Sequence, residues 1–216
     1  CRIALYGLYA TLNARTLFAR GADFIVGGEC EEPLVRLAQD LDADGSGERV
    51  EGVNATPRAP SARVPAAPWL RRIDFAVPQR ASLPPLERYA RLEHTGTTRL
   101  AGQTEASRGC LHFCRHCPIP PVYGGRFFVV PRDVVLADIR NQVASGATHM
   151  TFGDPDFLNG PGHSLAIMRA ARAEFPSLTF DFTAKIEHLL QHRDLLPEMA
   201  RLGCLFVVSA VESIDD

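Results

Sequence analysis

The first 44 residues alternate short apolar runs with amphipathic stretches. The apolar runs have the length of buried strands, and the stretches between and after them repeat apolar positions at helical spacing. Asn13 is the predicted N-cap of the first helix, and Gly21 follows its end. Alternating strands and helices predict a parallel, Rossmann-like sheet. The predicted elements are strands at 2–6 and 23–26 and helices at 14–20 and 33–41.

The same alternation returns from about residue 98. Pro131 and Ser164 are predicted to begin two of the intervening helices. Four strands alternating with helices predict an α/β fold that forms part of a (β/α) barrel, whose functional side chains gather at the carboxyl ends of the strands. The predicted strands are 99–106, 149–153, 178–185 and 204–211, and the helices are 131–146, 164–175 and 194–203.

Proline and glycine punctuate the segment between these two regions. Such composition disfavours regular structure and predicts an interdomain connector, with one short helix over 86–92. We find no catalytic signal in this segment. The predicted organisation is therefore the end of a Rossmann-like domain at 1–44, a connector at 45–97 and the first four units of a barrel at 98–216.

Composition narrows the class of protein. The 216 residues are 46% hydrophobic and carry a net charge of −2, which is ordinary for a globular chain and gives no nucleic-acid footprint. No apolar run approaches the roughly 18 residues of a membrane span, and no signal peptide is visible. The six cysteines fit a reducing cytoplasm better than a disulfide framework.

Three of these cysteines form the pattern C-x-x-x-C-x-x-C, at Cys110, Cys114 and Cys117. Three thiolates so close in sequence can hold three irons of a [4Fe–4S] cluster and leave the fourth iron open, because such clusters usually take four cysteines. The alternative is a structural zinc site, which needs four ligands and could use His112 or His116 as the fourth.

The cysteine spacing and its context resemble the radical S-adenosylmethionine (radical SAM) superfamily. The resemblance implies that the open iron chelates the amino and carboxylate groups of SAM. An electron from the reduced cluster then splits a carbon–sulfur bond of SAM and releases a radical that acts on a substrate. The implied cofactors are a [4Fe–4S] cluster and SAM, and the implied electron donor is a protein such as flavodoxin or ferredoxin.

The same resemblance assigns further site residues. Gly153 and Asp154 resemble the Gly-Gly-Glu motif that receives the SAM amino group, although an ordinary turn explains them too. His116 stands where the superfamily often has an aromatic residue near the SAM adenine, and an exposed loop histidine is its alternative. The residues expected at the barrel mouth, as contacts of SAM or of the substrate, are Lys185, Ser209 and Glu212.

The stretch 21–32 resembles the closing units of cobalamin-binding domains that precede many radical SAM domains. Cobalamin is therefore a further implied cofactor, and an ordinary Rossmann-like remnant is the alternative. No histidine precedes His94, so this part of the chain cannot supply an imidazole ligand to cobalt. The Asp-x-His-x-x-Gly loop that such domains use is absent from the sequence.

Three phrases, 115–123, 151–160 and 185–190, resemble a subgroup with a Cys-Cys-Ala-Glu-Pro tail. Enzymes of organoarsenical synthesis that transfer an aminocarboxypropyl group look similar. The chain starts at Cys1 and stops after a strand, so we expect a fragment that lacks about two barrel units. The specific alternatives are a cobalamin-dependent radical methyltransferase, an aminocarboxypropyl transferase, and a non-catalytic binding module stabilised by zinc or an Fe–S cluster.

Overall fold

The structure is a computed structural model, and it describes residues 1–56, 68–72 and 74–210. The chain divides into two compact units, which we describe separately. The first comprises Cys1–Asp74 and Leu111–Arg126, and the second comprises Phe75–Cys110 and Phe127–Asp216.

The first unit is built on a small three-stranded sheet. Strand β1 (Ala4–Tyr6) pairs in parallel with β2 (Phe24–Val26), and β2 pairs antiparallel with β3 (Val53–Ala55). All three residues of the central strand are buried, as expected for a strand with neighbours on both sides. Both predicted strands are present, whereas β3 lies in the connector segment, for which we predicted one short helix and no strand.

The helices of the first unit differ from prediction at their first boundary. Asn13 lies between two short helices and does not cap the second with its side chain; its Nδ2 donates to the carbonyl of Tyr9 at 2.9 Å. Asn13 therefore stands at the predicted N-cap position, but its side chain makes no capping bond, because an unpredicted helix ends at Leu12 and brings the Tyr9 carbonyl within reach. The helices are α1 (Leu8–Leu12), α2 (Ala14–Ala19), α3 (Glu31–Asp42) and α4 (Pro120–Tyr123).

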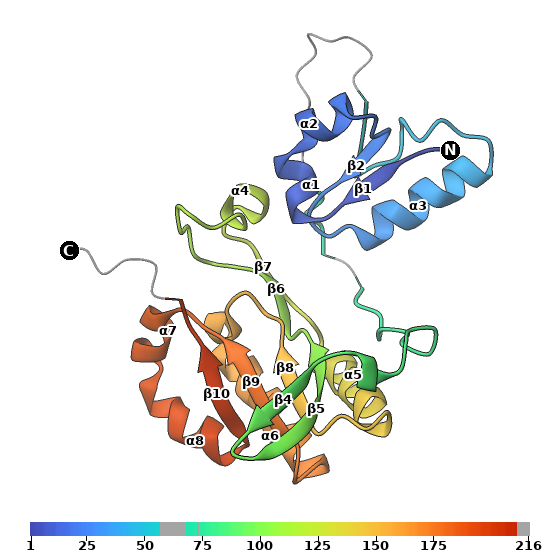
Figure 1. The fold of residues 1–216 in the computed structure, drawn as a ribbon. Coiled ribbons are helices and arrows are strands. Elements are labelled where there is room, and N and C mark those ends of the chain that lie inside the picture. The colour runs from blue at the N-terminus through green and yellow to red at the C-terminus, as the bar shows by residue number, and fades with distance from the viewer. Residues whose placement is uncertain (57–67, 73, 211–216) are drawn as a thin grey trace. The chain divides into compact units, whose positions relative to one another are not determined.

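The second unit contains a five-stranded sheet that curls into a half-barrel, with strand order β10-β9-β8-β5-β4 (Figure 1). Its four parallel strands confirm the predicted α/β barrel class, because they follow one another in chain order with helices between them. The fifth strand pairs antiparallel at the edge. The strands are β4 (Arg91–His94), β5 (Thr97–Thr104), β8 (His149–Phe152), β9 (Thr179–Thr183) and β10 (Cys204–Val208).

The helix predicted over 86–92 is wrong. Only a 3-10 turn, η1 (Leu86–Arg88), forms there, and β4 follows it. Thr95 and Gly96 adopt positive φ angles of 48° and 74°, as a two-residue hairpin turn requires. This turn folds β4 back onto β5, and the cross-strand hydrogen bonds outweigh the weak helical pattern.

Helix α6 also starts earlier than predicted. It begins at Pro161, whose fixed φ suits the first turn of a helix. Ser164 therefore lies inside the helix, where its Oγ donates to the carbonyl of Phe157 at 2.5 Å, and it is not the N-cap. The remaining elements are β6 (Ser107–Gly109), β7 (Phe127–Val129), α5 (Arg132–Ala144), η2 (Phe157–Asn159), α6 (Pro161–Glu174), α7 (Ile186–Gln191), η3 (Arg193–Leu195) and α8 (Leu196–Arg201).

Alternate residues of β8 and β9 face opposite sides of the sheet. Met150, Phe152, Phe180 and Phe182 are at most 1% exposed and belong to one hydrophobic core with the buried residues of α5 and α6. Burying such side chains is the main favourable contribution to folding. The core rings stack: the centroids of Phe152 and Phe157 lie 4.3 Å apart. The core thus fixes the strands and leaves the other face of the sheet for polar groups.

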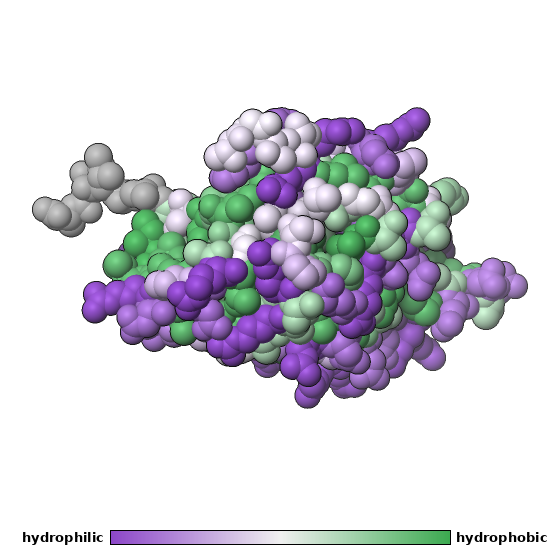
Figure 2. Space-filling model, turned by 90° about the horizontal axis from the view of Figure 1, so that it is seen from below, coloured by the Kyte–Doolittle hydropathy of each residue, from purple (hydrophilic) through white to green (hydrophobic). Residues whose placement is uncertain are grey.

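Among the described residues, no helix combines the length and apolar character that a membrane crossing needs. The face in Figure 2 carries hydrophilic residues with hydrophobic ones between them. Such a mixture is common on protein surfaces, which always contain much apolar area.

An ion pair between a half-buried arginine and a buried carboxylate fastens the segment before β4 to α5 within the second unit. Arg80 donates from Nε and from a terminal nitrogen to the two oxygens of Asp138, at 2.7 and 2.8 Å. The same guanidinium reaches the carbonyl of Gln103 on β5 at 3.0 Å. The Asp138 side chain is only 2% exposed, so its charge depends on these donors and on Gln142, which donates at 3.0 Å.

We predict that Arg80→Met lowers the free energy of unfolding by about 3 kcal/mol, because it leaves the buried Asp138 carboxylate without its cation. Urea unfolding measures this change. The matched control is Arg140→Met, which breaks an exposed pair with Glu174 and should change stability little. Equal effects of the two variants would contradict the prediction.

Candidate functional site

The carboxyl ends of the parallel strands in the second unit carry the predicted site residues. Gly153 and Asp154 follow β8, Lys185 follows β9, and Ser209 follows β10. Because parallel strands end at one edge of the sheet, these residues share the edge at which barrel enzymes place their chemistry. Glu212 lies outside the described residues.

Asp154 is almost fully buried, with 2% of its surface exposed. One carboxylate oxygen accepts from the backbone N–H of Ala106 at 2.9 Å, and the other accepts from the hydroxyl of Ser107. Burial raises the pKa of Asp154 to about 6 from its usual 3.8, and the hydrogen bonds from Ser107 and Ala106 oppose the rise only in part. The side chain therefore holds the segment that leads from β5 into β6.

Asp156 is a second buried carboxylate at the same edge. Its Oδ1 accepts from the backbone of Leu158 at 3.0 Å and caps η2. Its Oδ2 lies 3.3 Å from the backbone nitrogen of Lys185 and 2.9 Å from Nδ1 of His188. Asp156 thus joins the end of β8 to α7, whose His188 is one of the residues that the sequence places after the third barrel strand.

The other predicted residues at this edge have ordinary local contacts. The backbone N–H of Gly153 donates to the carbonyl of Thr104 at 2.8 Å. The ammonium of Lys185 lies 2.5 Å from a carboxylate oxygen of Glu187 and is partly exposed. The hydroxyl of Ser209 donates to the carbonyl of Ala184 at 2.7 Å. These contacts place each side chain at the strand ends, and their roles toward SAM stay predictions.

The three clustered cysteines are all unbonded thiols. Cys110 follows β6 and is buried, with its Sγ 3.9 Å from Oδ1 of Asn159. Cys114 and Cys117 lie on the part of the loop that belongs to the first unit, where both are half-buried and the backbone of Cys117 donates to that of Cys114 at 3.2 Å. A set of free thiols at this spacing fits either an Fe–S cluster or zinc.

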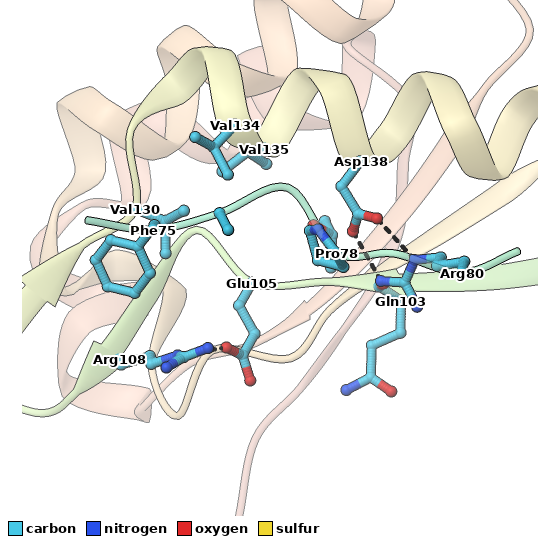
Figure 3. Close-up of a pocket in the computed structure, with 12 residues that line it drawn as sticks. Phe75, Pro78, Arg80, Gln103, Glu105, Arg108, Val130, Val134, Val135 and Asp138 are labelled. Carbon is cyan, nitrogen blue, oxygen red and sulfur yellow. Dashed lines mark hydrogen bonds and ion pairs between the residues drawn. The ribbon is translucent and has the colours of Figure 1, made fainter. Parts of the chain in front are cut away.

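Two basic residues and a histidine flank the cysteines. Arg108 is held by Glu105, with 2.9 Å between Nε and the carboxylate, and its guanidinium lies 5.2 Å from the ring centre of Phe75 (Figure 3). Its charge is therefore partly balanced before any ligand binds. Arg115 and His116 are exposed on the loop. His116 remains a predicted contact of the SAM adenine.

Two cavities adjoin the segment that precedes β4. The smaller, about 190 Å³, lies between this segment, β5 and α5, with Arg108 and Arg80 among its lining residues, each paired with a carboxylate (Figure 3). The larger, about 740 Å³, is lined by apolar residues of the same segment and reaches Gln103 and Thr151 on the sheet. The larger cavity has room for a small organic molecule.

Sequence reasoning missed a buried polar cluster on the face of the sheet opposite the core. His149 lies 2.7 Å from Asp181 through Nε2 and 2.8 Å from the hydroxyl of Thr179 through Nδ1. Thr151 donates to the same Asp181 oxygen at 2.7 Å. The alternation of polar and apolar residues along both strands carried this signal, because alternate side chains of a strand point to opposite faces.

Comparison with known proteins identifies a fold and no sequence family. No protein-family model and no curated protein matches the chain. Similar solved structures include TsrM from Kitasatospora setae, a radical S-adenosylmethionine methyltransferase, with tryptophan substrate and the SAM analogue aza-SAM bound. This match has a TM-score of 0.75 and 19% identity, and it covers 99% of the present chain and 42% of TsrM.

A second TsrM structure, with cobalamin and a [4Fe–4S] cluster bound, also matches with a TM-score of 0.75. The identity is 18%, and the match covers 99% of this chain and 43% of that one. The present chain therefore spans about two fifths of the length of the structures it resembles. At this level of identity the likeness shows a shared fold, which agrees with the predicted partial domain.

We predict that the buried Asp154 makes the protein less stable as pH rises from about 4 to 6. Across that window the folded chain keeps a proton that the unfolded chain has released, because the folded pKa is higher. The shift of about two pKa units corresponds to roughly 3 kcal/mol. In Asp154→Asn this part of the pH dependence should vanish, as urea unfolding at pH 4 to 7 would show.

Asp133→Asn is the matched control, because Asp133 is an exposed carboxylate on α5. It should keep the wild-type pH dependence. An Asp154→Asn protein whose stability still falls by the wild-type amount over this range would show that another group is responsible.

Proposed function

We propose that this chain is part of a radical SAM enzyme that binds a [4Fe–4S] cluster through Cys110, Cys114 and Cys117. The observation that carries the proposal is the pattern of three unbonded cysteines that begins immediately after β6. Strand β6 follows β5, the first parallel strand of the half-barrel. The spacing leaves one coordination position open on a cluster that usually takes four cysteines. The likeness to a radical SAM methyltransferase in fold supports the same class.

When bound, the cluster would supply an electron to SAM, and the protein would hold and orient the reactants. Asp154 and Asp156 are the carboxylates that we assign to bind the SAM ammonium group. Each already accepts hydrogen bonds from the protein, yet a carboxylate offers about four acceptor positions. We therefore assign them two roles. They fix the strand ends, and their remaining acceptor positions can bind a cation.

The remaining predicted site residues can each offer SAM or a substrate a more limited set of contacts. Lys185 and His116 offer positive or polar groups at the barrel mouth and on the loop, respectively. The hydroxyl of Ser209 is already a donor to Ala184, so it can offer a ligand only its acceptor positions. Glu212 keeps its predicted role from sequence alone. Apolar residues of the cavity of about 740 Å³, with Gln103 and Thr151, offer a site for a substrate with both apolar and polar parts.

A cobalamin-dependent methyl transfer is the second candidate function. The first unit contains a parallel pair of strands with helices, and TsrM, whose structure contains cobalamin, resembles 99% of this chain. Residues 1–93 contain no histidine, so a corrin bound there would lack an imidazole ligand from that stretch. Aminocarboxypropyl transfer and a zinc-stabilised binding module without catalysis are the further alternatives.

We predict that anaerobic reconstitution with iron and sulfide gives a reduced [4Fe–4S] signal in electron paramagnetic resonance that changes when SAM is added. The change is expected because SAM would occupy the open iron. Cys114→Ala should remove the signal, since two thiolates cannot hold the cluster.

The matched control is Cys204→Ala, which removes a thiol from β10, outside the loop. Burial raises the pKa of Cys204 to about 11, so this thiol is a poor ligand, and the variant should keep the wild-type signal. Tightly bound zinc, without a cluster or a response to SAM, would overturn the proposal and favour the binding module.

Product analysis separates the candidate reactions. We predict that the reduced, reconstituted protein converts SAM to 5′-deoxyadenosine, the product of the usual cleavage. Methylthioadenosine would instead assign aminocarboxypropyl chemistry, because it forms when the other carbon–sulfur bond breaks. Chromatography with and without added cobalamin measures both products. A methylated product that forms only with cobalamin would identify the methyltransferase alternative.

A further inference from the structure

A fully buried carboxylate in the first unit holds the helix that follows the cysteine pattern. Glu29 is 0% exposed, and the hydroxyl of Tyr123 donates to its Oε1 at 2.9 Å. The two residues are 94 positions apart in sequence. Tyr123 ends helix α4, which begins three residues after Cys117. One hydrogen bond thus joins the Rossmann-like sheet to the cysteine-bearing segment.

The carboxylate end of this bond is rigidly placed. Glu29 follows β2, and its backbone N–H donates to the carbonyl of Trp69 at 2.8 Å, while Trp69 donates to Gly27 at the same distance. Gly28 has a φ of 75°, and a side chain there would come within 2.2 Å of the Trp69 carbonyl. Trp69 is itself buried. The turn after β2 therefore cannot shift without breaking a paired backbone.

The phenol end is also packed. Helix α4 contacts α1, and its residue Val122 is 2% exposed. Gly125, just after the helix, has a φ of 75°, which residues with a side chain rarely adopt, and it lies against the ring of Phe113. Arg126 donates to the carbonyl of Leu70 at 3.3 Å. The segment between Cys114 and Arg126 is thus seated on the first unit at several points.

We propose that Glu29 and Tyr123 are positioning residues for the cysteine loop, and that the Rossmann-like unit sets the geometry of Cys114 and Cys117 through them. The inference rests on the proposed cluster. It gives the first unit a role in the site even where no corrin binds. A buried acceptor that loses a hydrogen-bond donor costs free energy, so removing the Tyr123 hydroxyl should loosen the loop measurably.

The first test uses the metal-free chain of 216 residues. Tyr123→Phe should speed hydrogen exchange of the α4 backbone amides about tenfold, because it removes the hydroxyl that donates to Glu29. Glu29→Gln keeps an oxygen acceptor and should lie between the wild type and Tyr123→Phe. Tyr6→Phe is the matched control, since Tyr6 is 65% exposed in the same unit, and it should exchange at the wild-type rate. Wild-type exchange in Tyr123→Phe would overturn the anchor.

The second test uses the reconstituted protein and a chelator. The Tyr123→Phe protein should lose iron about tenfold faster than either the wild type or Tyr6→Phe. The three proteins should have the same unfolding temperature. Faster exchange in the metal-free chain with unchanged iron loss would overturn the positioning role. A wild-type protein that assembles no cluster would defeat the proposed function instead, and the exchange test would still decide the anchor.

Discussion

The buried carboxylate of Asp154 ties the end of β8 to the segment that leads toward the first cysteine. Its oxygens accept from Ala106 and Ser107, so a side chain from the neighbouring strand sets the direction of the chain as it leaves β5. The bond depends on the parallel register that places Thr104 beside Phe152. A slip of one residue would turn Asp154 to the other face and release the segment.

Burying the carboxylate of Asp154 is by itself unfavourable for the free energy of folding. Burial penalises the charged form of Asp154 more than two hydrogen bonds favour it, and the pKa rises accordingly. An apolar residue would pack there at lower cost, but it could not satisfy the N–H of Ala106 or the hydroxyl of Ser107. Asp156, two residues later, has a similar role: its carboxylate accepts from the backbone N–H of Leu158 and from that of Lys185. The strand ends are thus organised by carboxylates.

Much of the fold followed from the alternation of apolar runs and helical patterns, because buried parallel strands and amphipathic helices have distinct periods. Local capping was less predictable. Asn13 and Ser164 are favoured at N-caps, yet each donates to a carbonyl of an element that was not predicted, α1 for Asn13 and η2 for Ser164. The hairpin of β4 escaped notice because its turn, Thr95-Gly96, is an unusual pair for positive φ angles.

The residues of the candidate site also fall into those that the sequence predicts and those that it does not. The three cysteines could be singled out by spacing alone, since they lie within eight residues of one another in the sequence. No local pattern could pair Glu29 with Tyr123, because the partners come from segments brought together only by tertiary packing. Sequence reasoning thus names ligands more readily than the groups that position them.

Each unit holds its own part of the cysteine segment with a buried carboxylate. In the second unit Asp154 accepts from Ala106 and Ser107 before the first cysteine, and in the first unit Glu29 accepts from Tyr123 after the last one. A loop ordered in advance loses less conformational entropy when it binds a ligand. Structural zinc can order a loop by itself, because binding and folding are coupled. A cluster that keeps one iron open has one protein ligand fewer to organise its surroundings. Under the proposed function, each carboxylate would order its own part of the cysteine segment before a cluster binds.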